Sequence, residues 1–146
     1  AVTEQSKDNP VFYVQMGHAR SQSVRRQALE AIPDIDLNIS SLLQADMSLV
    51  SDKGERAIIR SIADWPRLVS TAARTREPHR VAYYLYDLAS AFHAHWNRGK
   101  DMPHLRFIIP TDLSMTCARL ALVSAVGIVL RSGLAVLGVE APDEMR

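Results

Sequence analysis

The sequence predicts an all-α fold, a helical bundle of about five helices, and three observations support this. Apolar residues recur at spacings of three and four along several segments, as they do on the inward face of a helix. No run of useful length alternates apolar and polar residues as a half-buried strand does. The 146 residues are 47% hydrophobic and 23% charged, which suits one domain with a real core. Helices packed on helices are the simplest arrangement for this pattern.

The first helix is expected near the start of the chain. Residues 1–8 are polar and aperiodic, which predicts a disordered tail or a boundary cut in a linker, so that the helical domain occupies residues 9–146. Helical spacing then runs from Pro10 to about Leu29. Proline at this place is consistent with a first helical turn, where its missing N–H is tolerated.

A loop and two short helices are expected next. The segment 33–46 is rich in Asp and Ser and predicts a loop, with at most a turn of helix over Ser40–Gln44. A helix over 54–64 has the apolar stripe Ile58, Ile59, Ile62 and Ala63. Trp65-Pro66 interrupts it, because proline restricts the residue before it, and another helix runs from about Arg67 to Thr75.

A fourth long helix opens at Pro78. Its inward face is a stripe at spacings of three and four, formed by Leu85, Leu88, Ala89, Phe92 and Trp96. Asn97-Arg98-Gly99 predicts the end of this helix, and residues 101–110 make a connection.

The last long helix is expected to begin near Thr111 or Asp112, which are good capping residues, and to run past Leu130. The segment Leu120–Leu130 is apolar except for Ser124. Because a bilayer span needs roughly 20 apolar residues, we interpret this segment as a helix buried from most sides and not as a membrane span. Gly133 and Gly138 are predicted to mark its end.

Composition narrows the possible functions. A lone cysteine, Cys117, excludes an internal disulfide framework, and the chain opens without a charged-then-apolar leader, so a cytoplasmic location is expected. His93 and His95 are two residues apart and point in different directions on a helix, and no metal-binding spacing accompanies them, so no metal site is predicted. No glycine-rich phosphate loop is present either, so this segment has no means of activating an amino acid with ATP.

A net charge of +1 does not by itself indicate a nucleic-acid-binding protein, but positively charged residues are concentrated in one part of the sequence. Arg74, Arg76 and Arg80 cluster at the turn before the fourth helix and are candidates for phosphate binding. A solvated run of charges is the competing interpretation.

One face of the first helix has side chains suited to nucleotides. Met16 and Arg20 are four residues apart, and Ser23 and Gln27 continue the same stripe. Unpaired bases bind to polarisable or flat groups and to hydrogen-bond donors such as Arg and Gln. An ordinary half-solvated helix face remains the alternative. Gln15 lies on a different face, as does His18, and both are expected to support the structure.

Two segments together resemble the C-terminal anticodon-binding domain of arginyl-tRNA synthetases. The run from Asn9 to Arg20, NPVFYVQMGHAR, is similar to that family's NPVYYVQYAHAR and departs from it at Phe12, Met16 and Gly17. The run from Gly133 to Met145, GLAVLGVEAPDEM, fits the family's GL-x-LLG-x-x-AP-x-x-M ending. The segment 116–119, Thr-Cys-Ala-Arg, only weakly resembles the DALR tetrapeptide after which the domain is named.

The resemblance implies a set of anticodon-binding residues: Met16, Arg20, Trp96 and Met145. The family residue at position 16 is usually tyrosine, and methionine lacks its ring and hydroxyl, so stacking there is expected to be weaker or rearranged. Trp96 also fits a core position on its helix, and a frayed terminus is the alternative for Met145. Supporting or backbone contacts are expected from Gln15, Ser23, Gln27, Arg74, Arg76 and Arg80.

The resemblance further implies a parent enzyme, an arginine–tRNA ligase of class I, whose catalytic domain with its HIGH signature lies N-terminal to this part. No cofactor is expected in this fragment, while ATP and Mg would bind in the catalytic domain. The expected partners are the tRNA for arginine and the catalytic domain of the same polypeptide, with no DNA and no membrane.

Two alternatives remain from the residues. The chain could serve another class I synthetase, such as the cysteine-specific one, although the HAR and AP-x-x-M motifs favour arginine. It could also be a helical protein-interaction module, whose binding should depend far less on salt than RNA binding does.

Overall fold

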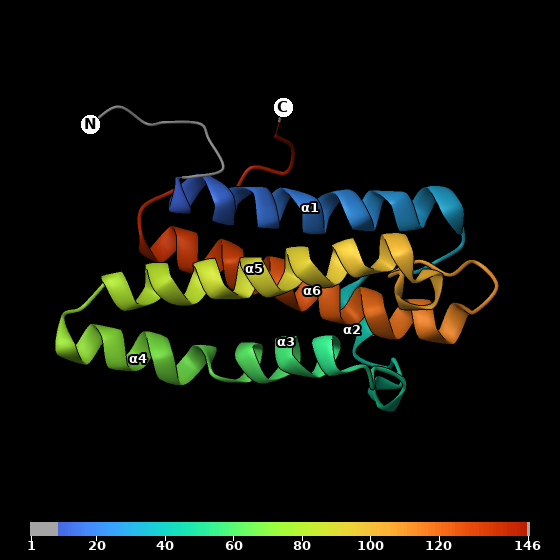
Figure 1. The fold of residues 1–146 in the computed structure, drawn as a ribbon, viewed down its shortest axis with the longest axis horizontal. Coiled ribbons are helices and arrows are strands. Elements are labelled where there is room, and N and C mark those ends of the chain that lie inside the picture. Colours follow the sequence, from blue (N-terminus) through green and yellow to red (C-terminus); the bar gives the residue numbers. More distant parts are fainter. Residues whose placement is uncertain (1–8, 146) are drawn as a thin grey trace.

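The computed structural model describes residues 9–145 as an all-α bundle with no strand in that range, which confirms the predicted fold class (Figure 1). The tail predicted at residues 1–8 lies outside the described residues. In chain order the α helices and the short 3₁₀ turns, labelled η, are α1 (Pro10–Ala31), α2 (Ile39–Leu42), η1 (Met47–Leu49), α3 (Lys53–Ala63), α4 (Trp65–Thr75), α5 (His79–Asp101), η2 (Pro103–Leu105) and α6 (Leu113–Val136).

The long helices form three rows. Figure 1 shows α1 along one side, α5 and α6 in the middle, and α3 and α4 end to end along the other side. Both α5 and α6 pack against α1, and α5 also packs against α3 and α4. The core therefore lies around α5 and α6, and α1 packs on it with residues that include Val14, Val24 and Ala28.

Helix α1 begins where the sequence predicts, because Asn9 caps it. The Asn9 Oδ1 accepts hydrogen bonds from the backbone N–H groups of Val11 at 3.0 Å and Phe12 at 3.3 Å, and Pro10 occupies the first turn. The helix continues two residues beyond the predicted Leu29.

The two short helices α3 and α4 are close to their predicted bounds. The Asp52 carboxylate caps α3 by accepting from the Gly54 N–H at 2.8 Å. Trp65-Pro66 opens α4 and is not a gap before it, since proline fits a first turn. Ala63, expected in the apolar stripe, is exposed at the end of α3. The segment before α3 contains α2 and η1, and α2 corresponds to the turn of helix expected over Ser40–Gln44, but it starts one residue earlier and ends two residues earlier.

The predicted stop at Asn97-Arg98-Gly99 is wrong, because α5 continues to Asp101. Gly99 is buried, and a Cβ atom there would lie 3.4 Å from the Cα of Arg106. The segment after η2 therefore passes Gly99 at van der Waals distance, and the glycine does not end the helix.

Helix α6 is the central element, and Asp112 caps it as predicted by accepting from the Met115 N–H at 3.1 Å. It is 24 residues long and contains an 18-residue window with a mean hydropathy of 1.9, so its length does not exclude a membrane span, contrary to the sequence argument. Since α1, α5, α3 and α2 all pack on it, we interpret it as the interior helix of the bundle.

The two glycines near the end of the chain have different roles. Gly138 follows the helix with φ +72°, a left-handed conformation that favours glycine. Gly133 lies inside α6 against Leu85, so its predicted role as a helix end is wrong.

Candidate nucleic-acid interface

Side chains from α1, α5 and the C-terminal segment line an open cavity of about 450 Å³. We call it the anticodon cavity after the residues predicted to bind the anticodon, which are among those that line it. All four residues predicted to bind the anticodon line it, namely Met16, Arg20, Trp96 and Met145. Ser23 and Gln27, predicted as supporting residues, line it too, together with Ala19, Val24, Arg26 and Glu144. The structure thus brings together residues up to 129 positions apart in the sequence.

Arg20 is held in place at the wall of this cavity. Its Nη1 donates a hydrogen bond to Nδ1 of His93 at 2.7 Å, and its guanidinium carbon lies 4.0 Å from the centroid of the Trp96 ring. A cation over an indole ring is attracted to the negative face of that ring. These two contacts restrict the guanidinium, so it needs little further ordering when it binds a ligand.

Trp96 belongs to the cavity wall and is only partly buried, whereas Phe92, one turn earlier on α5, is 1% exposed. Trp96 thus packs against the core and lines the cavity as well, so both interpretations that the sequence leaves open stay predictions. The Lys100 Nζ also lies near the indole, 4.4 Å from its centroid.

The C-terminal segment is held along α1 by three side chains of that helix, two of which belong to the first motif. Gln15 Nε2 donates to the carbonyl of Glu140 at 2.9 Å, and Nδ1 of the buried His18 donates to the carbonyl of Pro142 at 2.9 Å. Arg26 Nη1 donates to the carbonyl of Asp143 at 3.3 Å. The supporting roles expected for Gln15 and His18 fit these contacts, which place Met145 beside Met16 and Arg20.

The three arginines proposed for phosphate contacts lie elsewhere. Arg74 and Arg76 are at the end of α4 and Arg80 is at the start of α5, and none of them lines the anticodon cavity. Arg80 Nε donates to the Glu77 carboxylate at 2.8 Å. Any contact of these residues with RNA would therefore be made outside the cavity.

A second polar cluster lies in the interior, where Asp52, Glu55 and His95 have ligand atoms within 4.8 Å of one another. Both carboxylates are paired with arginines. Arg98 Nη1 donates to Asp52 at 2.8 Å, and Arg119 donates to the Glu55 oxygens from Nε and Nη2, each at 3.2 Å. Since two guanidiniums already neutralise the charge, the cluster is better explained as an ion-pair network than as a cation site.

His93 and Lys100 are the residues that sequence reasoning missed. His93 was considered only as a metal ligand, yet it is one turn before Trp96 on α5, and Lys100 is one turn after it. Helical spacing around Trp96 was therefore the available signal.

The contact between His93 and Arg20 predicts a pH-dependent stability. Burial, followed by the nearby Arg20 charge, lowers the pKa of His93 to about 4. In the unfolded chain the His93 imidazole is protonated near the ordinary histidine pKa of about 6.5, whereas in the folded chain it is protonated only near pH 4. The contribution of neutral His93 to the free energy of unfolding is therefore complete well above pH 6.5 and is lost as the pH falls toward 4. The free energy of unfolding, measured with urea at pH 7.5 and 4.5, should fall less between these pH values for His93→Gln than for the unaltered chain. The two falls should differ by on the order of 1 to 2 kcal/mol. His79→Gln, at an exposed position, serves as the control. Equal falls for the unaltered chain and for His93→Gln would contradict the prediction.

Comparison with known proteins gives consistent results. The model of the family described as DALR anticodon binding domain matches residues 14–145. The chain is 61% identical over 145 residues to the arginine–tRNA ligase of Methylobacterium nodulans, covering 99% of this chain and 25% of that protein. It is 60% identical over 146 residues to the arginine–tRNA ligase of Methylorubrum extorquens strain PA1, again covering 99% of this chain and 25% of that protein.

The fold is also found in a solved structure. A crystal structure from Campylobacter jejuni described as an arginyl-tRNA synthetase matches with a TM-score of 0.77 at 20% identity, over 97% of this chain and 28% of that chain. This likeness concerns the fold alone. The chain spans about a quarter of the length of the curated relatives named above. With most of its length matched by the family model, this chain belongs to the DALR anticodon binding domain family.

Proposed function

We propose that this chain binds the anticodon loop of the tRNA for arginine, as one domain of a longer arginine–tRNA ligase. The observation that carries the proposal is the anticodon cavity, where Met16, Arg20, Trp96 and Met145 meet although they come from three separate parts of the chain. Relatives that are about 60% identical and are named arginine–tRNA ligase support the choice of amino acid.

The chemistry of the cavity suits an unpaired base. Every arginine codon has G in its middle position, so every arginine tRNA presents C at the centre of its anticodon. The two methionines and the indole offer soft surfaces for a splayed base, while Arg20, Gln27 and Ser23 offer hydrogen-bonding groups for its edge or its phosphate. Phosphate contacts would contribute affinity and base contacts specificity.

The remaining parts of the proposal concern the parent protein. ATP and Mg would bind in its catalytic domain, and the present chain would dock the tRNA so that the acceptor end reaches that domain. We place the parent enzyme in the cytoplasm, with tRNA and its own catalytic domain as partners. Arg74, Arg76 and Arg80 would contact the RNA backbone outside the cavity.

The test is Arg20→Ala in the full-length ligase. Loss of a charged hydrogen-bond donor should raise the KM for tRNA about 10- to 100-fold, while the KM for arginine changes little. Aminoacylation kinetics with each substrate varied in turn measure both constants. Arg60→Ala, an exposed arginine of α3 that does not line the cavity, should leave the kinetics unaltered. Unchanged tRNA kinetics for Arg20→Ala would remove this residue from the proposed role.

The comparisons do not favour the alternatives of a cysteine-specific synthetase or a protein-interaction module. Binding of the full-length protein to arginine and cysteine tRNA transcripts over a salt series would separate all three. Only the proposed function expects a preference for the arginine transcript together with a steep loss of affinity at high salt.

A further inference from the structure

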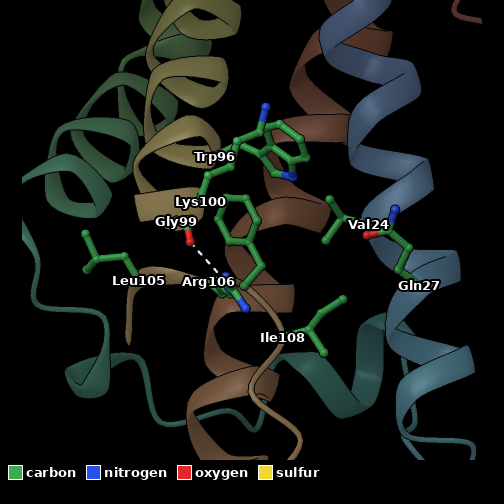
Figure 2. Close-up of a pocket in the computed structure, with 9 residues that line it drawn as sticks. Val24, Gln27, Trp96, Gly99, Lys100, Leu105, Arg106 and Ile108 are labelled. Carbon is green, nitrogen blue, oxygen red and sulfur yellow. Dashed lines mark hydrogen bonds between the residues drawn. The ribbon is translucent and has the colours of Figure 1, made fainter. Parts of the chain in front are cut away.

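A second cavity, of about 390 Å³, adjoins the anticodon cavity, and we call it the loop cavity. Figure 2 shows it between α1, which contributes Val24 and Gln27, and the segment after α5, which contributes Leu105, Arg106 and Ile108. Val24, Gln27 and Trp96 line both cavities, so the two share a wall. Its volume lies in the range of small-ligand sites.

We infer that the loop cavity receives a second unpaired nucleotide of the same anticodon loop, next to the one held in the anticodon cavity. This inference rests on the proposed function, because it requires RNA on the neighbouring surface. It adds a subsite and the residues that form it.

The interior of the loop cavity suits a nucleobase. Leu105 and Phe107 are each 4% exposed and Val24 is 2% exposed, so apolar side chains with fixed positions form its deep part. The amide of Gln27, which is exposed at the boundary of the two cavities, can both donate to and accept from the edge of a base. An apolar slot with one amide at its edge is typical of sites for unstacked bases.

The rim of the loop cavity suits a phosphate. Lys100 and Arg106 are both exposed there. Arg106 Nε donates to the carbonyl of Gly99 at 3.0 Å, which holds the guanidinium at the rim. Figure 2 shows this bond below Lys100. Two cations beside an apolar slot match a nucleotide better than they match an apolar peptide.

The two cations near Trp96 differ in how firmly they are held. Arg20 is hydrogen-bonded to His93, whereas Lys100 is exposed and its one interaction within residues 9–145 is with the indole. Lys100 can therefore leave the ring for a phosphate while Arg20 stays. Trp96 would then separate two neighbouring nucleotides, one in each cavity.

The experiment fills the loop cavity and removes one base at a time. The full-length ligase carries Ile108→Trp, and its Kd is measured for the arginine tRNA transcript and for transcripts with one abasic nucleotide at each position of the anticodon loop. The variant should bind the intact transcript about tenfold more weakly, the size of one stacked base. For one abasic transcript, Ile108→Trp should cause no further loss of affinity, because the base that the tryptophan would displace is already missing from that transcript. Ile39→Trp, the same change at an exposed position of α2, should bind like the unaltered ligase.

Two results would overturn the subsite. The first is unaltered binding of every transcript by the Ile108→Trp variant. The second is an equal weakening for all abasic transcripts, which is expected if another segment of the protein occupies the cavity. Arg20→Ala in the same assay separates this failure from that of the proposed function. If Arg20→Ala loses affinity and Ile108→Trp does not, the subsite fails alone, and if neither loses affinity, both proposals fail.

A second variant keeps the test decisive if Ile108→Trp does not fold. Lys100→Gln should reduce the slope of log Kd against log salt by about 0.7 to 1, the value for one phosphate contact. Lys53→Gln, at an exposed lysine that opens α3, should leave the slope unaltered. An unaltered slope for Lys100→Gln would also overturn the subsite.

Discussion

Replacing Arg119 by alanine is expected to lower the free energy of unfolding by about 3 to 5 kcal/mol, the largest effect of any single change considered. The Glu55 carboxylate is fully buried and would lose both hydrogen bonds from the guanidinium. The backbone carbonyls of His104 and Arg106 would also lose the Arg119 Nη1, which donates to them at 2.8 and 2.9 Å. Since domains of this size are stable by roughly 5 to 15 kcal/mol, such a loss is a large share of the total. Urea unfolding at neutral pH measures it.

Two comparisons isolate the cause of this loss. Arg98→Ala also removes an arginine from a carboxylate, but this pair is 29% and 20% exposed, so water can replace the lost contacts and the effect should be smaller. Replacing Glu55 and Arg119 together by leucine should destabilise less than Arg119→Ala alone, because no unpaired charge remains inside. A loss below about 1 kcal/mol for Arg119→Ala would refute the assigned role.

The Gly133→Val variant is expected to be destabilised by about 2 to 3 kcal/mol. A Cβ atom at position 133 would lie 2.4 Å from Cδ2, 2.6 Å from Cδ1 and 2.8 Å from Cγ of Leu85. Leu85 is 0% exposed, so the whole side chain, and with it the contact between α5 and α6, would have to shift. The better helix propensity of valine offsets less than about 1 kcal/mol of this.

A double-mutant cycle tests the clash directly. Leu85→Ala alone should cost about 2 to 5 kcal/mol, but with Gly133→Val present the combined loss should be clearly smaller than the sum, because the larger residue fills the new space. Ala135→Val, at an exposed position of α6, should change stability by less than about 0.5 kcal/mol. Additive losses at positions 85 and 133 would show that the close contact is not the reason.

Several features of the protein are determined by the sequence alone, and these are the local ones. The caps Asn9 and Asp112 each act on backbone groups within three residues, so a short stretch of sequence is enough to locate the starts of α1 and α6. The stripe that carries Met16 and Arg20 follows from helical spacing, and all its members line one cavity. The motif resemblance likewise indicated the family that the comparisons show.

Only the tertiary structure decided the role of other residues, because their partners are far along the chain. Arg20 and His93 are 73 positions apart, His18 and Pro142 are 124 apart, and Glu55 and Arg119 are 64 apart. Helical spacing gives the direction of a side chain on its own helix but does not give the residue that faces it. The same limit explains Gly99, which sequence reasoning assigned to the end of α5 although the helix continues past it, beside the segment that carries Arg106. A cap depends on the next turn of the chain, whereas a cavity depends on how three separated segments pack together.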